Sequence, residues 1–168
     1  GEFNVAIGNY SLDANTEGDN NVALGYAALS SNTTGTNNTA VGKDALASNT
    51  TGLKNVSLGY LGLNANTTGY ANTSVGTETL IANTTGEYNI GMGYEALKSN
   101  TTGDRNIAIG TQAYDAADTE NDNLAIGHEA LGGSIAGGEF NVAIGNYSMD
   151  ALTSGDKNTG VGYNTLTG

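Results

Sequence analysis

The chain carries a short apolar pattern that recurs every 17 residues. Each copy starts with Asn, continues with a large residue, a small residue and a second large residue, and ends with Gly, as in Asn4 to Gly8. The step is 17 residues throughout, except between Asn123 and Asn141, where it is 18. The copies start at Asn4, Asn21, Asn38, Asn55, Asn72, Asn89, Asn106, Asn123, Asn141 and Asn158. A fixed period of this length predicts a single repeat array over residues 1–168.

Each copy has the period of a β-strand. Large residues two positions apart, separated by a small one, follow the two-residue alternation of a strand and not the 3.6-residue period of a helix. Within the first copy we expect Val5 and Ile7 to point inward and Ala6 to point outward. The Gly that follows supplies a corner with positive φ.

A second apolar column lies eight residues after each Asn. Its members are Leu12, Leu29, Leu46, Leu63, Leu80, Leu97, Tyr114, Leu131, Met149 and Leu166. We expect this column to close the core from the side opposite the strands. The sequence therefore predicts an all-β fold, a β-solenoid or parallel β-roll of about ten 17-residue rungs. A helix pair is excluded because each repeat holds too many Gly, Asn and Thr residues.

The recurring Asn is interpreted as scaffold. Stacked rungs would place its amides in a line, where they can hydrogen-bond to one another from rung to rung. A ligand-binding or catalytic amide would not need ten copies in a row.

The turn sequence Asn-Thr-Thr-Gly closes five consecutive rungs, beginning at Asn32, Asn49, Asn66, Asn83 and Asn100. The first interpretation is turn chemistry, in which Asn and Thr side chains bond to nearby backbone. The same letters fit an N-glycosylation site. An ice-binding row of threonines is a third alternative, although these threonines adjoin a Gly corner and such a face needs a flat strand.

Charge and composition narrow the function classes. The formal net charge is −12, which disfavours binding to nucleic acid or to an anionic membrane surface. No apolar stretch approaches the length that a membrane-spanning helix needs, so no membrane insertion is expected. The chain has no Cys, which excludes disulfides and Cys-based metal or redox chemistry.

A column of rings follows the corner Gly. Tyr26, Tyr60, Tyr94 and Tyr163 occupy this column on alternating rungs, which suggests a paired unit of 34 residues. Rings two rungs apart would be about 9.6 Å from each other, too far for direct stacking. These tyrosines are candidates for contact with a partner surface or a glycan, or for packing between copies of the chain. His128 lies in the same column and is interpreted as a substitute for Tyr.

The seventh rung replaces the usual turn by an acidic segment. Asp118, Glu120 and Asp122 alternate as in part of a calcium loop, and they are the weak metal candidates of the chain. Asn123 occupies the position at which such a loop needs Gly, so a solvated acidic corner is the favoured interpretation. No catalytic motif is present, and we expect neither an enzyme nor a cofactor.

The rung Asn-x-Ala-[Ile/Val/Leu]-Gly, as in Asn4 to Gly8 and Asn106 to Gly110, resembles the head repeats of YadA-type trimeric autotransporter adhesins. Residues 38–52 are also similar to repeat regions of phage tail fibres. The resemblance implies a left-handed parallel β-roll, a side-by-side trimer, display on a cell or virion surface, and contact with a host surface or glycans. The rungs here are longer than those of the adhesins.

The function expected on this basis is a structural or adhesive segment of an extracellular fibre, with other copies of itself as the first partner. Residues 1–14 recur almost unchanged as residues 138–151, and neither end of the array has a polar cap, which predicts a longer array or an end-to-end filament. The alternative is a carbohydrate-binding or carbohydrate-cleaving solenoid, with the Tyr column and the acidic seventh rung forming a groove. An ice-binding rod is the third alternative.

Overall fold

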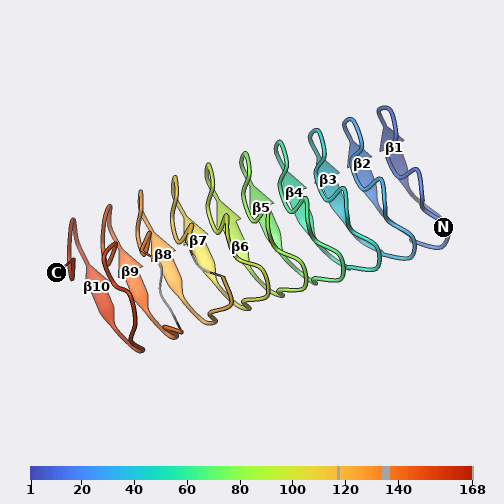
Figure 1. Cartoon of the computed structure of the whole chain (residues 1–168). Coiled ribbons are helices and arrows are strands. Elements are labelled where there is room, and N and C mark those ends of the chain that lie inside the picture. The colour runs from blue at the N-terminus through green and yellow to red at the C-terminus, as the bar shows by residue number, and fades with distance from the viewer. Residues whose placement is uncertain (117, 134–136, 168) are drawn as a thin grey trace.

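The computed structural model confirms the β-solenoid. Each coil contributes one short strand, and the coils stack into a rod (Figure 1). The strands form one parallel sheet in chain order, and the structure describes residues 1–116, 118–133 and 137–167. The strands are β1 (Val5–Ile7), β2 (Val22–Leu24), β3 (Thr39–Val41), β4 (Val56–Leu58), β5 (Thr73–Val75), β6 (Ile90–Met92), β7 (Ile107–Ile109), β8 (Leu124–Ile126), β9 (Val142–Ile144) and β10 (Thr159–Val161).

Neighbouring strands pair in register, so that equivalent residues form columns along the rod. Val5 pairs with Val22, for example. The pairing of Leu124 with Val142 keeps the same register across the one step of 18 residues. The additional residue therefore leaves the sheet unchanged.

The predicted orientation of the strands is wrong. The small middle residue points into the core: Ala23, Ala40, Ala108, Ala125 and Ala143 are fully buried. The large residues on either side of it are exposed or half-buried, as at Val22 and Leu24. A strand shifted by one residue presents its other face, so the alternation alone does not say which set is buried. The narrow coil admits only a small side chain opposite the Leu column.

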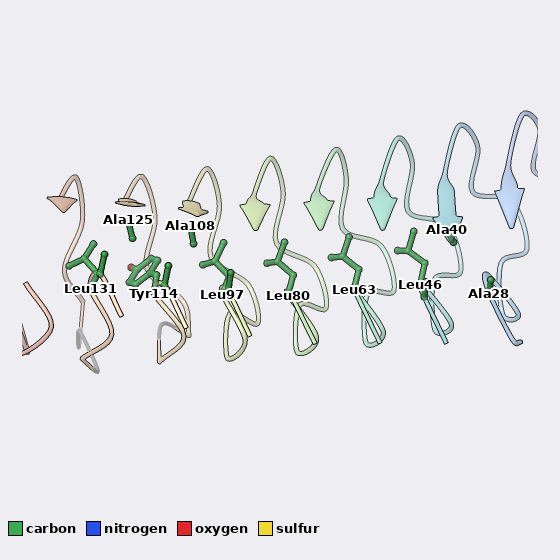
Figure 2. Packing of buried hydrophobic residues seen from close by; sticks show 14 of the residues in the cluster. Ala28, Ala40, Leu46, Leu63, Leu80, Leu97, Ala108, Tyr114, Ala125 and Leu131 are labelled. Carbon is green, nitrogen blue, oxygen red and sulfur yellow. The ribbon is translucent and has the colours of Figure 1, made fainter. Parts of the chain in front are cut away.

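The predicted Leu column is confirmed as the core, except at Leu166 in the last rung, which is 56% exposed. Leu29, Leu46, Leu63, Leu80, Leu97 and Leu131 are fully buried, and Tyr114 and Met149 occupy the same column. Figure 2 shows Ala108 and Ala125 pointing from their strands toward this column. A second set of small residues, including Ala28, Ala45 and Ala113, completes the core. The apolar interior is therefore only one Leu and two small residues deep in most rungs.

Small residues of successive rungs compensate for one another in volume. Where the residue before Leu80 is Thr79 instead of Ala, the next strand carries Gly91. A Cβ on Gly91 would lie 2.5 Å from Thr79 Cγ2. A Cβ on Gly62 would lie 2.4 Å from the hydroxyl oxygen of Ser57 in its own rung and 2.7 Å from that of Ser74 in the next rung. Such matching indicates that the core is tightly packed.

The coil bends sharply at three positions in every rung where a residue other than Gly has positive φ. In the second rung these are Asn20, Ala27 and Leu29, and over the chain their φ values lie between 48° and 61°. Each such residue costs about 1–2 kcal/mol relative to the right-handed region. The backbone bonds between rungs hold them in place; Ala27 N, for example, donates to Asn9 O.

The Gly after each strand is required for two reasons. At Gly59 φ is 141°, a conformation that L side chains rarely adopt. A Cβ there would also lie 2.2 Å from the carbonyl oxygen of Gly76 in the next rung. The predicted corner with positive φ is thus confirmed.

Candidate functional surfaces

The outer face of the sheet is a continuous apolar strip. It consists of the first and third residue of each strand, β1 to β10, which are apolar except for Thr39, Thr73 and Thr159. Exposed members include Ile7 at 58%, Leu24 at 43% and Met92 at 40%. We call these two columns the apolar face. It contains the large strand residues that the sequence analysis expected to point inward.

The Tyr column lies beside the apolar face, directly after the corner Gly. Tyr26, Tyr60, Tyr94 and Tyr163 are all exposed, Tyr163 most of all. No direct ring contact joins any two of them among the described residues. Instead, the ammonium group of Lys43 lies 6.0 Å from the ring centre of Tyr26 and 5.6 Å from that of Tyr60. The gap between alternating rings is filled here by a cation.

Two tyrosines that the sequence analysis did not single out pack against the rings of this column. Tyr10 packs edge-on against Tyr26, with ring centres 5.6 Å apart. Tyr147 makes similar contacts with His128 and with Tyr163, at 5.1 and 5.9 Å. Both belong to the next column along the rung, so only the folded geometry brings them beside their partners.

His128 occupies a Tyr position and packs like one. Its Nδ1 lies 3.1 Å from the carbonyl oxygen of Thr111, and its Nε2 lies 3.2 Å from a Glu129 carboxylate oxygen. The ring also contacts Tyr147. These contacts agree with its interpretation as a substitute for Tyr.

A charged cluster around Lys98 lies near the middle of the Tyr column. Lys98 contacts the carboxylates of Glu95 and, at 3.6 Å, Glu78. The hydrogen bond from Lys98 lowers the pKa of Glu95, and a hydrogen bond to Glu95 raises the pKa of Tyr94. Burial raises the pKa of Asp115, and the negative charge of Glu129 raises it further.

The structure gives the three carboxylates of the acidic seventh rung separate partners. Asp122 accepts two hydrogen bonds from the guanidinium of Arg105, at 2.7 and 2.9 Å. Asp118 accepts a hydrogen bond from the Thr101 hydroxyl. Glu120 turns inward and is 7% exposed. Within the described residues, no group of three or more His, Asp or Glu side chains is placed to hold a metal ion.

Glu120 replaces the turn Gly and binds backbone N–H groups. Its carboxylate accepts from Asp118 N at 3.0 Å, Thr119 N at 3.1 Å and Gly137 N at 3.0 Å. Burial alone would raise the pKa of Glu120, but these N–H groups outweigh it, and the pKa lies below its ordinary value. The carboxylate thereby ties the turn of one rung to the next.

The same rung carries the aromatic exception of the Leu column. Tyr114 is fully buried, and its hydroxyl oxygen accepts a hydrogen bond of 2.6 Å from Asn123 Nδ2. Burial raises the pKa of Tyr114 far above its ordinary value. Asn100 Oδ1 is buried without a partner, and the residue one rung later in its column is Ala117, which has no amide to donate. Ala117 itself lies outside the described residues.

Two columns of Asn hold the rungs together, and the predicted bonding of the first is only partly right. The oxygen of each recurring Asn accepts from the backbone N–H of the next, as from Asn38 N to Asn21 Oδ1 at 2.9 Å. Its nitrogen donates to a turn carbonyl, that of Gly35 in the case of Asn21. Direct amide-to-amide bonding runs instead through the turn Asn column, as from Asn49 Nδ2 to Asn32 Oδ1 at 2.8 Å. Near the C-terminal end, Asn141 and Asn158 combine both patterns.

The turn threonines also bond to backbone. In four of the five Thr pairs the first hydroxyl donates to the carbonyl of the equivalent Thr in the next rung, as from Thr33 to Thr50 at 3.0 Å. In the fifth pair, Thr101 donates to the carbonyl of Asp118. The second Thr, such as Thr34, is exposed. The turn Asn residues are fully buried, which leaves their amides inaccessible to a glycosylating enzyme in the folded chain. The turn-chemistry interpretation is confirmed, with the Thr acceptor lying one rung away.

The Tyr column and the acidic seventh rung do not come together. Asp122 precedes β8 and His128 follows it, so the two features lie at opposite ends of the short strands. No pocket is found over the described residues. No helix in the described part of the chain is long and apolar enough to span a membrane.

Comparison with protein-family models, with curated proteins and with solved structures finds no match to this chain.

Proposed function

We propose that this chain is a structural or adhesive segment of an extracellular fibre, a rod that assembles side by side with copies of itself through its apolar face. The observation that carries the proposal is the apolar face, in which the third strand residue is apolar in all ten strands and the first is apolar in seven. Soluble monomers rarely expose a continuous apolar strip, and such a strip marks an interaction surface.

A second copy of the chain is the occupant that fits best. The apolar face repeats at the spacing of the strands, and another rod of the same kind presents the same repeat and the same straight edge. The trimer implied by the adhesin resemblance is the specific arrangement proposed. Burial of these columns would remove from water the large side chains that the narrow coil leaves outside.

The test is the mass of the assembly in solution. Sedimentation equilibrium should give three times the chain mass of 16.9 kDa for the unmodified protein. Ile109→Glu in the apolar face should shift the mass toward the monomer and leave the circular dichroism spectrum unchanged. Thr85→Glu, at an exposed turn position, is the matched control and should keep the trimer. A monomer for the unmodified chain, or equal masses for the two variants, would contradict the proposal.

The exposed Tyr column supports a second role as the surface that contacts a partner or glycan. Aromatic rings present flat apolar faces with a polar tip, which suits such contacts. Binding to a glycan array that is lost in Tyr60→Ala and retained in Tyr60→Phe would support glycan recognition, and release of reducing sugar would indicate a carbohydrate-cleaving enzyme instead.

A further inference from the structure

The chain places one of its own cations between two rings of the Tyr column. Tyr26 and Tyr60 lie two rungs apart, and Lys43 lies on the rung between them. The Lys43 ammonium is within 6.0 Å of both ring centres. Its nearest carboxylate is that of Asp44, 3.6 Å away. Two rings and one carboxylate thus surround an ammonium group, an arrangement that attracts cations through the negative ring faces.

The next gap in the column has the same pair of rings, but the residue between them carries no cation. Tyr60 and Tyr94 are again two rungs apart, and the residue between them is Thr77. Strands β4, β5 and β6 pair in the same register as β2, β3 and β4, so the three column positions are equivalent in both gaps. Both rings are exposed, Tyr60 at 41% and Tyr94 at 48%. The short Thr side chain carries no charge into the gap.

Both gaps have a carboxylate at the equivalent position. Glu78 follows Thr77 as Asp44 follows Lys43. Glu78 is shared with Lys98, whose ammonium lies 3.6 Å away and which also contacts Glu95. Two carboxylates against one ammonium leave this part of the rod negative, in line with the net charge of −12. A ligand cation therefore meets both aromatic and electrostatic attraction.

We propose that the gap between Tyr60 and Tyr94, above Thr77, is a binding site for an alkylammonium group, either a free small cation or a lysine side chain of another polypeptide. The position of Lys43 in the preceding gap indicates where the ligand nitrogen lies. The site is shallow and exposed, so binding is expected at millimolar concentrations, as is usual for a few solvent-exposed cation–ring contacts.

The test is a titration with tetramethylammonium chloride, followed by the NMR signals of the Tyr60 and Tyr94 rings. The unmodified chain should show saturable shifts of these two rings. Sodium chloride and the neutral analogue tert-butanol should not produce them. Nα-acetyl-lysine methylamide tests the second source of the cation: shifts with this compound at similar concentrations would extend the site to lysine side chains, and shifts with tetramethylammonium alone would restrict it to free cations.

Two variants make the test specific because each converts one gap into the other. Thr77→Lys supplies an internal ammonium and should abolish the tetramethylammonium response of Tyr60 and Tyr94. Lys43→Thr empties the first gap and should raise the number of bound cations from one to two, with new shifts at Tyr26. Both changes are on the surface, and unchanged circular dichroism spectra would show that the coil is intact. Absence of saturable shifts in the unmodified chain, an unaffected response in Thr77→Lys, or no additional site in Lys43→Thr would each overturn the proposal.

Discussion

Replacing Gly91 by Ala adds one methyl group at a place where the core has no room for it. The new Cβ would lie 2.5 Å from Thr79 Cγ2 and 3.4 Å from two carbons of Leu80. Overpacking of this kind costs about 1–3 kcal/mol. Replacing Thr79 by Ala removes the obstructing methyl group, but it also removes the hydrogen bond from the Thr79 hydroxyl to Gly93 O. That loss costs about 1 kcal/mol.

The two changes together recreate a pair that the chain already uses. In the next rung Ala96 and Ala108 occupy the equivalent positions, and both are fully buried. The double variant Thr79→Ala/Gly91→Ala should therefore be no less stable than Thr79→Ala alone. Ala in a strand is also favoured over Gly by about 0.5–1 kcal/mol. The coupling energy of the pair is expected to be about 1–3 kcal/mol in favour of the double variant.

Guanidinium chloride unfolding of the four proteins at one concentration, followed by circular dichroism, gives this coupling. The comparison needs equal slopes for the four unfolding curves, since a changed slope would mean that the rod no longer unfolds as one unit. Additive effects, or a Gly91→Ala variant as stable as the parent, would refute the conclusion that the small strand residues point inward and determine the packing.

Two further predictions concern the backbone and the acidic rung. Gly59→Ala should lower the free energy of unfolding by at least about 3 kcal/mol, because its Cβ would lie 2.2 Å from Gly76 O and its φ is 141°. The control is Gly132→Ala, whose Cβ would come no closer than 3.2 Å to an atom beyond its chain neighbours, and it should change the free energy of unfolding by less than about 1 kcal/mol. Similar losses for the two variants in guanidinium unfolding would contradict the role of the corner Gly. Glu120→Gln should destabilise the chain at pH 7 by about 1–3 kcal/mol, because a carboxylate binds N–H groups more strongly than an amide does. The folded-state pKa of Glu120 lies below its ordinary value, so its stabilising effect is present above about pH 4.5 and is lost as the pH falls through the folded-state pKa. Melting temperatures of the two proteins should then converge in acid, and a difference that persists or grows there would refute this role.

The rung length, the strand positions and the Leu column were predictable from the sequence because each rests on a repeated spacing. The period places equivalent residues one above the other, and the column at Leu46, Leu63 and Leu80 keeps a large apolar residue in every rung, which favours its burial. The exposed Tyr column was predictable for a similar reason, since Lys43 and Thr77 alternate with its rings. Columns that tolerate both charge and aromatic rings face solvent.

The face of the strands that points inward was predicted wrongly, because the large residues of the large-small-large pattern were assigned to the core by size alone. A signal against that assignment was present. The middle position is Ala, Ser or Gly in every rung, whereas the flanking positions admit Thr, Val, Ile, Leu and Met. Uniform smallness indicates a tight buried site, and Thr39 and Thr73 at flanking positions indicate solvent. The bends at positions such as Ala27 could not be predicted, because nothing in those side chains distinguishes positive φ.

The seventh rung shows why some exceptions need the structure. Asp118, Glu120 and Asp122 read as three equivalent acids in the sequence, yet one is a buried acceptor and another pairs with Arg105. Glu120 stands where other rungs have Gly. A side chain at these Gly positions would clash with the turn Asn; a Cβ added at Gly103 would lie 2.4 Å from Asn100 Oδ1. With Ala in place of that Asn at position 117, no amide oxygen opposes a side chain there. The replacement of Gly by Glu at position 120 and of Asn by Ala at position 117 can be explained only together, because the two positions are neighbours in the turn.

The in-register pairing of the strands has a consequence for how the chain folds. Almost every backbone bond between rungs joins residues about 17 positions apart, which is a tenth of the 168 residues. Parallel sheets usually demand contacts between distant parts of a chain and form slowly, but here the relative contact order is about as low as in helical bundles. Once any two rungs have paired, each new rung needs to close only one short loop, so folding can start at any point and spread in both directions.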